Sequence, residues 1–119
     1  MSFEIAYTAQ AKQDLKDIYV YIAEELSEPA VAKKQLLRLL DAASSLDSLP
    51  MRYPVYAEEP WRSQGLRVMP KNKYMILYLP CIEDEIVYIV RVMYGGRDLQ
   101  AQLRETDFTF DTTGTSSPG

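Results

Sequence analysis

The stretch IVYIVRVMYGGRDLQAQL, residues 86–103, decides the fold of this chain. It begins as a run of β-branched, apolar and aromatic residues interrupted by Arg91, which is the pattern of a strand in a sheet. A Gly-Gly pair after Tyr94 breaks the strand, and Arg97 and Asp98 then open a short helical pattern. Folding alone seldom needs two arginines and a Tyr-Gly-Gly break at the end of a hydrophobic strand. The segment therefore draws attention as a candidate functional site.

Three strands are expected in the second half of the chain, at residues 66–69, 74–79 and 86–93. The turns between them, at 70–73 and 82–85, are only a few residues long. Connections this short require antiparallel pairing. We therefore expect an antiparallel sheet.

The first half predicts one strand and a helix. Phe3, Ile5 and Tyr7 alternate with polar or small residues, and Thr8 has the side chain of a helix N-cap. Apolar residues then recur at helical spacing, which predicts a helix with one apolar stripe. That stripe contains Ala11, Leu15, Ile18, Ile22 and Leu26, and the charged outer face contains Lys12, Asp14, Lys16 and Asp17.

A second helix is expected after Ser27 as its cap and Pro29 near its first position, where the missing N–H costs nothing. An apolar stripe runs on to Leu46, and Pro50 closes the helix. Residues 9–49 are thus expected to form an antiparallel helical hairpin.

Residues 50–65 contain three prolines and no sustained periodicity, so they are expected to form a loop. Tyr53, Tyr56 and Trp61 lie in this loop. These rings either tie it to the core or remain exposed as contact anchors.

The whole pattern predicts an α+β domain of order β-α-α-β-β-β-α over residues 1–106, with the helical hairpin on one face of an antiparallel sheet. The tail from Thr112 is polar and small, and residues 107–119 are expected to be disordered.

Composition excludes several classes of site. The chain has no histidine and one cysteine, Cys81, which excludes an internal disulfide and the usual forms of a zinc site, a Ser-His-Asp triad or a Cys-His dyad. Cys81 lies in an apolar run and is expected to be buried. No metal or cofactor is expected. No apolar run is long enough to span a bilayer, and the N-terminus lacks the pattern of a signal peptide, so we expect a cytoplasmic protein.

Charge is distributed unevenly along the chain. Residues 1–61 carry six basic and ten acidic side chains, residues 62–104 carry seven and four, and residues 105–119 carry three acidic and no basic ones. The basic half suits an anionic partner. The overall net charge of −4 argues against strong non-specific binding to nucleic acid.

Three segments, in this order, carry a resemblance to a known family: AKQDLKDIYVYIAEEL (11–26), GLRVMPKNKYMILYLP (65–80) and IVYIVRVMYGGRD (86–98). With the opening strand they resemble the ParE/RelE superfamily of type II toxin–antitoxin modules over roughly residues 3–104. The resemblance implies a small toxin neutralised by a cognate antitoxin that wraps around it. It also implies one of two targets: RelE-like members cut mRNA on the ribosome, and ParE-like members poison DNA gyrase.

The ribonuclease alternative needs a base, an acid and cations for the charge that develops on phosphate. The resemblance to RelE-like nucleases places Arg97 at their arginine after the fourth strand, and Arg67 where second-strand lysines fall. Their third-strand arginine is replaced by Met75 and their last-helix tyrosine by Leu103. The catalytic candidates, if the chain is a nuclease, are Arg67, Lys71, Lys73 and Arg97.

The gyrase alternative, which we favour, needs a complementary surface with a few anchors and no catalytic set. The candidates for binding the target or the antitoxin are Trp61, Arg67, Arg91, Tyr94 and Arg97. A third alternative is a non-toxic interaction module of the same fold.

Some of these candidate residues also have a purely structural alternative. By strand alternation Arg91 shares a face with Ile89 and Met93, and it either serves function or pairs with a carboxylate such as Glu4. Lys71 and Lys73 flank a turn, where they are either functional or simply solvated.

Overall fold

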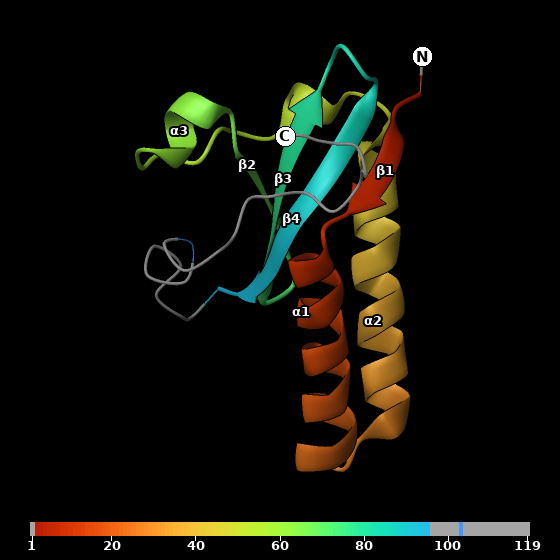
Figure 1. Ribbon diagram of the computed structural model, residues 1–119. Helices are drawn as coiled ribbons and strands as arrows, with labels where there is room; N and C mark the ends of the chain where they lie inside the picture. Colours follow the sequence, from red (N-terminus) through yellow and green to blue (C-terminus); the bar gives the residue numbers. More distant parts are fainter. Residues whose placement is uncertain (1, 96–102, 104–119) are drawn as a thin grey trace.

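A four-stranded sheet carries a long helical hairpin in the computed structural model, which describes residues 2–95 and 103 (Figure 1). The predictions for Gly96, Arg97 and Asp98, the domain boundary at 106 and the tail 107–119 lie outside the described residues. The elements, in chain order, are β1 (Glu4–Tyr7), α1 (Ala9–Val20), the π-helix η1 (Tyr21–Glu25), α2 (Pro29–Ser44), the 3₁₀ turns η2 (Ser45–Asp47) and η3 (Pro50–Arg52), α3 (Trp61–Gln64), β2 (Arg67–Lys71), β3 (Tyr74–Cys81) and β4 (Ile86–Tyr94).

The sheet has the strand order β1-β4-β3-β2. The predicted antiparallel pairing of β2 with β3 and of β3 with β4 is confirmed. The sheet as a whole is mixed, however, because β1 pairs with β4 in parallel, with Glu4 opposite Ile86 and Tyr7 opposite Ile89. The expectation of a fully antiparallel sheet was wrong, because the short turns that supported it join only β2, β3 and β4. The α1–α2 hairpin intervenes between β1 and the rest of the sheet, and a crossover of that length permits parallel pairing.

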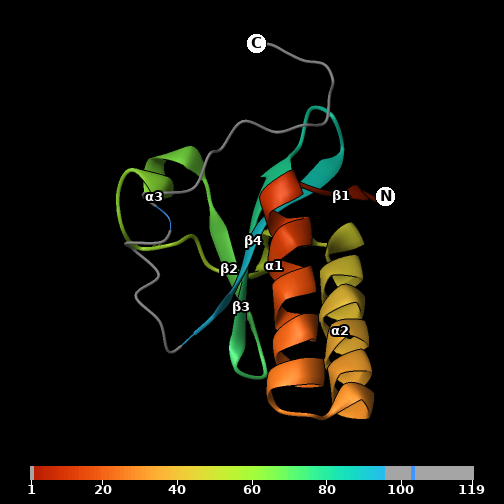
Figure 2. The same ribbon diagram turned by 60° about the horizontal axis from the view of Figure 1, so that its bottom comes forward.

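The helical hairpin forms where the sequence predicts it, and α1 and α2 lie side by side in both views (Figures 1 and 2). Thr8 is the N-cap of α1, and its Oγ1 accepts a hydrogen bond from the N–H of Ala11 at 3.1 Å. Pro29 opens α2, as expected. The predicted cap at Ser27 is wrong. Ser27 has a φ of 55°, and Glu28 is the cap residue, without a side-chain cap bond.

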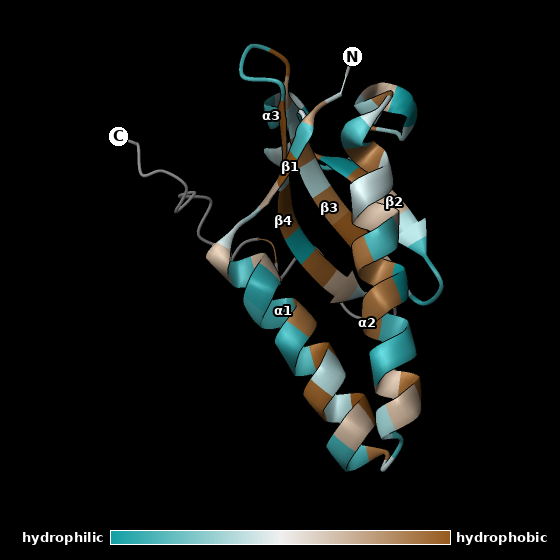
Figure 3. Cartoon of the chain, turned by 90° about the vertical axis from the view of Figure 1, so that its right-hand side faces the viewer, coloured by the Kyte–Doolittle hydropathy of each residue, from teal (hydrophilic) through white to brown (hydrophobic). Residues whose placement is uncertain are grey.

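Two apolar clusters hold the layers together. The helix-side cluster joins the hairpin to one face of the sheet and contains Ala11, Leu15, Leu39, Ala42, Ala43, Leu46, Met69, Ile76, Tyr78, Val87, Ile89 and Val92. The far-side cluster covers the opposite face and contains Trp61, Leu66, Leu77, Val90, Met93 and Leu103. In Figure 3 the two central strands, β3 and β4, are therefore mostly brown, whereas brown and teal alternate along the helices.

Two smaller features complete the description. Cys81 is partly exposed at the end of β3, with its Sγ 3.4 Å from an Asp84 carboxylate oxygen, so the expectation of a buried thiol was wrong. Among the described helices, none is long and apolar enough to cross a membrane.

Candidate functional site

The end of β4 is held by the start of α1. β1 stops at Tyr7, opposite Ile89, while β4 continues to Tyr94. Beyond that point Thr8 makes hydrogen bonds to the edge of β4 in place of a neighbouring strand. Its N–H donates to the carbonyl of Ile89 at 3.0 Å, and its Oγ1 donates to the carbonyl of Val90 at 2.9 Å. One residue thus caps α1 and satisfies the edge of β4, where buried backbone groups need partners.

Asp14, six residues after Thr8, also makes hydrogen bonds to the edge of β4 in place of a strand. Its carboxylate accepts hydrogen bonds from Nε and Nη2 of Arg91, at 2.7 and 2.9 Å, and from the backbone N–H of Val92, at 2.9 Å. The side chains of Asp14 and Arg91 are only 8% and 11% exposed. Arg91 therefore pairs with a carboxylate, as one alternative expects, but the partner is Asp14 and not Glu4. The placement of Asp14 on the charged outer face of α1 was also wrong.

A β-bulge explains why strand alternation fails at Arg91. Leu77 lies opposite Arg91 and the next residue, Tyr78, lies opposite Ile89, so β4 has one extra residue at this point. Ile89 consequently packs in the helix-side cluster and Met93 in the far-side cluster. The prediction that Arg91 shares a face with both is wrong, because the extra residue shifts the alternation.

Arg67 is engaged with the loop that follows the helical hairpin. Its Nη1 donates to the backbone carbonyl of Met51 at 3.1 Å and to that of Tyr53. A β-bridge between Arg67 and Val55 fixes the same loop against β2. The guanidinium thus satisfies carbonyl groups within the fold, as a structural arginine does.

Trp61 is buried, with 6% of its surface exposed, and packs in the far-side cluster beside Leu66 and Leu77. It ties the short helix α3 to the sheet, which is the first of the two roles considered for the loop aromatics. Its ring is covered by the protein itself, so the structure argues against Trp61 as an exposed contact anchor.

The lysines and Tyr94 meet at one end of the sheet. The turn between β2 and β3 places Lys71 and Lys73 on either side of Asn72, whose φ is 56°; Lys73 is exposed and Lys71 partly buried. The carbonyl of Lys73 accepts a hydrogen bond from the N–H of Gly95 at 2.8 Å. A Cβ at position 95 would lie 3.3 Å from that oxygen, so the close approach favours glycine.

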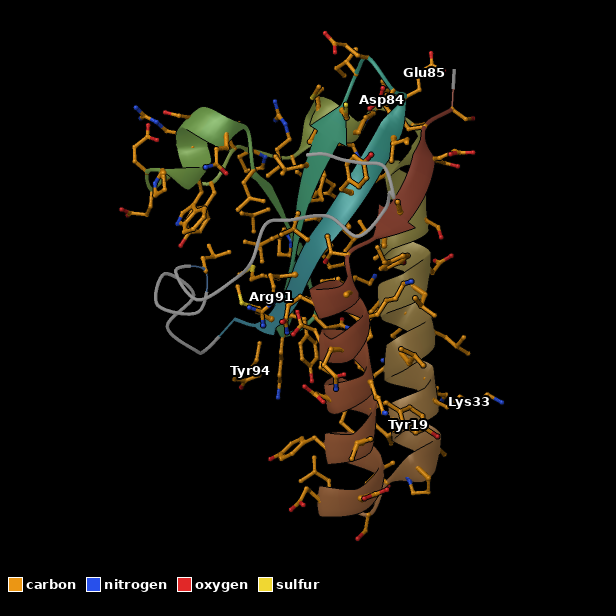
Figure 4. The ribbon with its side chains drawn as sticks, viewed as in Figure 1. Tyr19, Lys33, Asp84, Glu85, Arg91 and Tyr94 are labelled. Atoms are coloured by element: carbon orange, nitrogen blue, oxygen red, sulfur yellow. The ribbon has the colours of Figure 1, made fainter. Side chains whose placement is uncertain are left out.

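Tyr94 lies next to this turn. Its ring meets that of Tyr74 edge to face, with centroids 5.9 Å apart and an interplanar angle of 71°. Tyr94 is 45% exposed. Figure 4 shows Tyr94 and Arg91 at one end of β4, and Asp84 and Glu85 at the opposite end. The structure therefore brings together Lys71, Lys73 and Tyr94, with Arg91 close by in β4 and held by α1.

Two contributions were missed by sequence reasoning. Asp14 lies three residues after Ala11, at the border of the apolar stripe of α1, and that position is the only sequence signal of its burial. The contact by which the partly buried Tyr74 supports the exposed Tyr94 also has no signal in the sequence. Arg97 lies outside the described residues. Within residues 2–95 and 103, no three acidic or cysteine side chains are grouped so as to hold a metal ion.

A family model for the ParE toxin of type II toxin–antitoxin systems (parDE) matches residues 5–99. The chain belongs to the ParE toxin family. A solved structure described as the chromosomal ParDE toxin–antitoxin system from P. aeruginosa is similar to this toxin, with a TM-score of 0.63 and 18% identity, over 78% of this chain and 96% of that one.

The toxin–antitoxin complex RelBE2 of Mycobacterium tuberculosis has a TM-score of 0.59 and 20% identity, over 79% of this chain and 92% of that one. At these identities the likeness shows a shared fold, which confirms the predicted ParE/RelE architecture. A comparison with curated proteins finds no match for the toxin.

Proposed function

We propose that this ParE-family toxin stops growth by binding and poisoning DNA gyrase in the cytoplasm, without cutting RNA. The observation that carries the proposal is the use of Arg67 and Arg91 within the fold. Arg67 donates to backbone carbonyls, and Arg91 is paired with Asp14 in a site that excludes most water. Both guanidinium groups are thus engaged by partners within the fold.

The positions that RelE-like nucleases use for proton and phosphate chemistry support the same conclusion. Met75 packs against the far-side cluster and Leu103 is fully buried in it. Apolar side chains at these positions cannot transfer a proton or stabilise charge on phosphate. Among the candidates in the described part of the chain, only Lys71 and Lys73 retain a position suited to RNA.

Binding to a protein target needs no catalytic set of side chains. A half-exposed aromatic ring beside cations is a common anchor at protein interfaces, and Tyr94 beside Lys73 has that character. The proposal assigns the same end of the sheet to target recognition.

We further propose a cognate antitoxin as the second partner, since one of the similar solved structures is described as a toxin–antitoxin complex. An open apolar groove of about 320 Å³ lies on the helical hairpin and is lined by Leu15, Lys16, Tyr19 and Leu36. It suits the apolar face of a segment that folds as it binds.

The test is a gyrase assay with purified toxin that scores both supercoiling and trapped double-strand cleavage. The proposal predicts trapped cleavage at a toxin concentration comparable to that of gyrase, with ribosome-bound mRNA left intact. Cleaved mRNA with unaffected gyrase would establish the nuclease alternative. A folded protein that neither affects gyrase nor slows growth would establish the non-toxic module.

A further inference from the structure

Three tyrosines from separate elements form one surface where the sheet meets the helical hairpin. We define this tyrosine surface as Tyr21 at the start of η1, Tyr74 at the start of β3 and Tyr94 at the end of β4. Tyr74 and Tyr94 touch edge to face. Tyr21 lies seven residues after Asp14, about two helical turns, so it shares the face of the helix on which Asp14 holds Arg91, three residues before Tyr94 in β4. Burial raises the pKa of the Tyr74 hydroxyl, and the Tyr94 and Tyr21 side chains raise it further, in agreement with this placement.

The outer two rings face solvent while the middle one supports them. Tyr21 is 55% exposed and Tyr94 is 45% exposed, whereas Tyr74 is half-buried and packs against the helix-side cluster. Large aromatic rings at this exposure do little for a core. They supply rigid contact area at a low entropic cost, which is the property of interface anchors.

The backbone beneath the tyrosine surface is held firmly. The pair Asp14–Arg91 and the bond from Gly95 to Lys73 fix the end of β4 on either side of Tyr94. Tyr21 begins a π-helical turn, in which the N–H of Leu26 donates to its carbonyl at 3.1 Å. Such wide turns are rare and occur frequently at functional sites. The surface is therefore organised before any partner arrives.

The charges around the tyrosine surface indicate the kind of partner. Lys71 and Lys73 border it on the side of the β2–β3 turn, while Glu24 and Glu25 follow Tyr21 in η1. A nucleic acid would bring its phosphates against these carboxylates, and nucleic-acid interfaces are strongly positive. Rings flanked by charges of both signs match a protein segment with an apolar anchor and a charged rim.

We propose that the tyrosine surface is the place where the toxin contacts its protein target, with an apolar side chain of the target packed on Tyr21 and Tyr94. The inference rests on the proposed function, since it takes the target to be a protein. The surface is separate from the groove that contains Tyr19. Because Tyr19 and Tyr21 are two residues apart, their side chains leave α1 on opposite flanks, about 200° apart around its axis.

The experiment compares Tyr21→Ser, Tyr94→Ser and the double variant with wild type, both in gyrase assays and in growth arrest after induction. Ile82→Ser is the matched control, because Ile82 is 54% exposed at the opposite end of the sheet. Tyr94→Phe keeps the ring and removes only the hydroxyl. Circular dichroism and thermal melting establish that each variant is folded, as expected for half-exposed positions.

We expect Tyr94→Ser and Tyr21→Ser each to raise the toxin concentration needed for half-maximal effect by about tenfold or more, and the double variant to raise it further. Ile82→Ser should stay within about threefold of wild type, and Tyr94→Phe, which keeps the ring, should lose less activity than Tyr94→Ser. Folded serine variants that act like wild type would overturn the proposal.

The growth-arrest assay shows whether the proposed contact surface is wrong or whether gyrase is the wrong target. If wild type stops growth without affecting gyrase, gyrase is the wrong target, and the serine variants still test the surface through growth. Loss of arrest in those variants, with mRNA intact in wild type, then supports a different protein target. If wild type instead cleaves mRNA and the serine variants lose cleavage, the partner is RNA and the proposal is overturned.

Discussion

The carboxylate of Asp14 in α1 is joined to the guanidinium of Arg91 in β4 across 77 positions of sequence, and the same carboxylate accepts the N–H of Val92. The pair is almost fully buried. It replaces the hydrogen bonds that β1 would have made had that strand continued. The placement of Tyr94 thus depends on a helix residue near the beginning of the chain.

Asp14→Ala should lower the free energy of unfolding by about 3–5 kcal/mol, because it leaves a buried guanidinium and a buried N–H without their partner. Chemical denaturation measures this loss. Asp17→Ala is the matched control on the same helix, since the side chain of Asp17 is exposed and accepts a hydrogen bond from Gln13, and it should cost less than about 1 kcal/mol.

The double variant Asp14→Leu with Arg91→Met separates the cost of the unpaired guanidinium from the cost of the unsatisfied N–H. Removing both charges should restore part of the stability lost in Asp14→Ala, while the N–H of Val92 stays unsatisfied. A loss below about 1 kcal/mol in Asp14→Ala would show that the pair is not a principal support of β4.

Local signals in the sequence predicted much of this fold. The three later strands follow from β-branched runs between turns, α1 from Thr8 and its apolar stripe, and the start of α2 from Pro29. The parallel pairing of β1 could not be predicted in this way, because nothing local to residues 4–7 records which edge of the sheet the strand will join.

The site was harder to predict than the fold, for a related reason. A β-bulge adds one residue without changing composition, so the run IVYIVRVM reads as regular alternation although the register shifts beside Leu77. An aspartate at the border of a helical stripe looks solvated until its partner is known. The exposure of Tyr21 has no local signal either, since only the three-dimensional structure shows that the hairpin leaves it exposed.

Arg67→Ala should lower stability by about 1.5 kcal/mol, through loss of the bonds to the carbonyls of Met51 and Tyr53, while growth arrest per folded molecule is unchanged. Denaturation and an induced-growth assay give the two quantities. Arg62→Ala is the control, because its ion pair with Glu59 is exposed and should contribute less than about 1 kcal/mol. Loss of activity from a fully stable Arg67→Ala protein would instead favour a catalytic arginine.

Trp61→Ala should lower the free energy of unfolding by about 3–5 kcal/mol, because it empties the centre of the far-side cluster. Trp61→Phe keeps most of the apolar volume and should cost less. Thermal melting ranks the two variants against wild type. If Trp61→Ala melts like wild type but no longer affects gyrase, the ring is a contact residue and its burial is not its main role.

Stability at high pH should depend on Tyr74. Burial raises the pKa of its hydroxyl above the ordinary value of 10.0, so the unfolded chain ionises first as pH rises. The contribution of Tyr74 is therefore fully present below pH 10.0 and is lost as pH climbs through the raised value in the folded state. Tyr74→Phe has no ionisable group at this position, so its free energy of unfolding should fall less steeply across that range. Denaturation series on both proteins, from neutral pH upward, measure the difference between the slopes. Equal slopes would mean that the Tyr74 hydroxyl is as well hydrated in the folded toxin as in the unfolded chain.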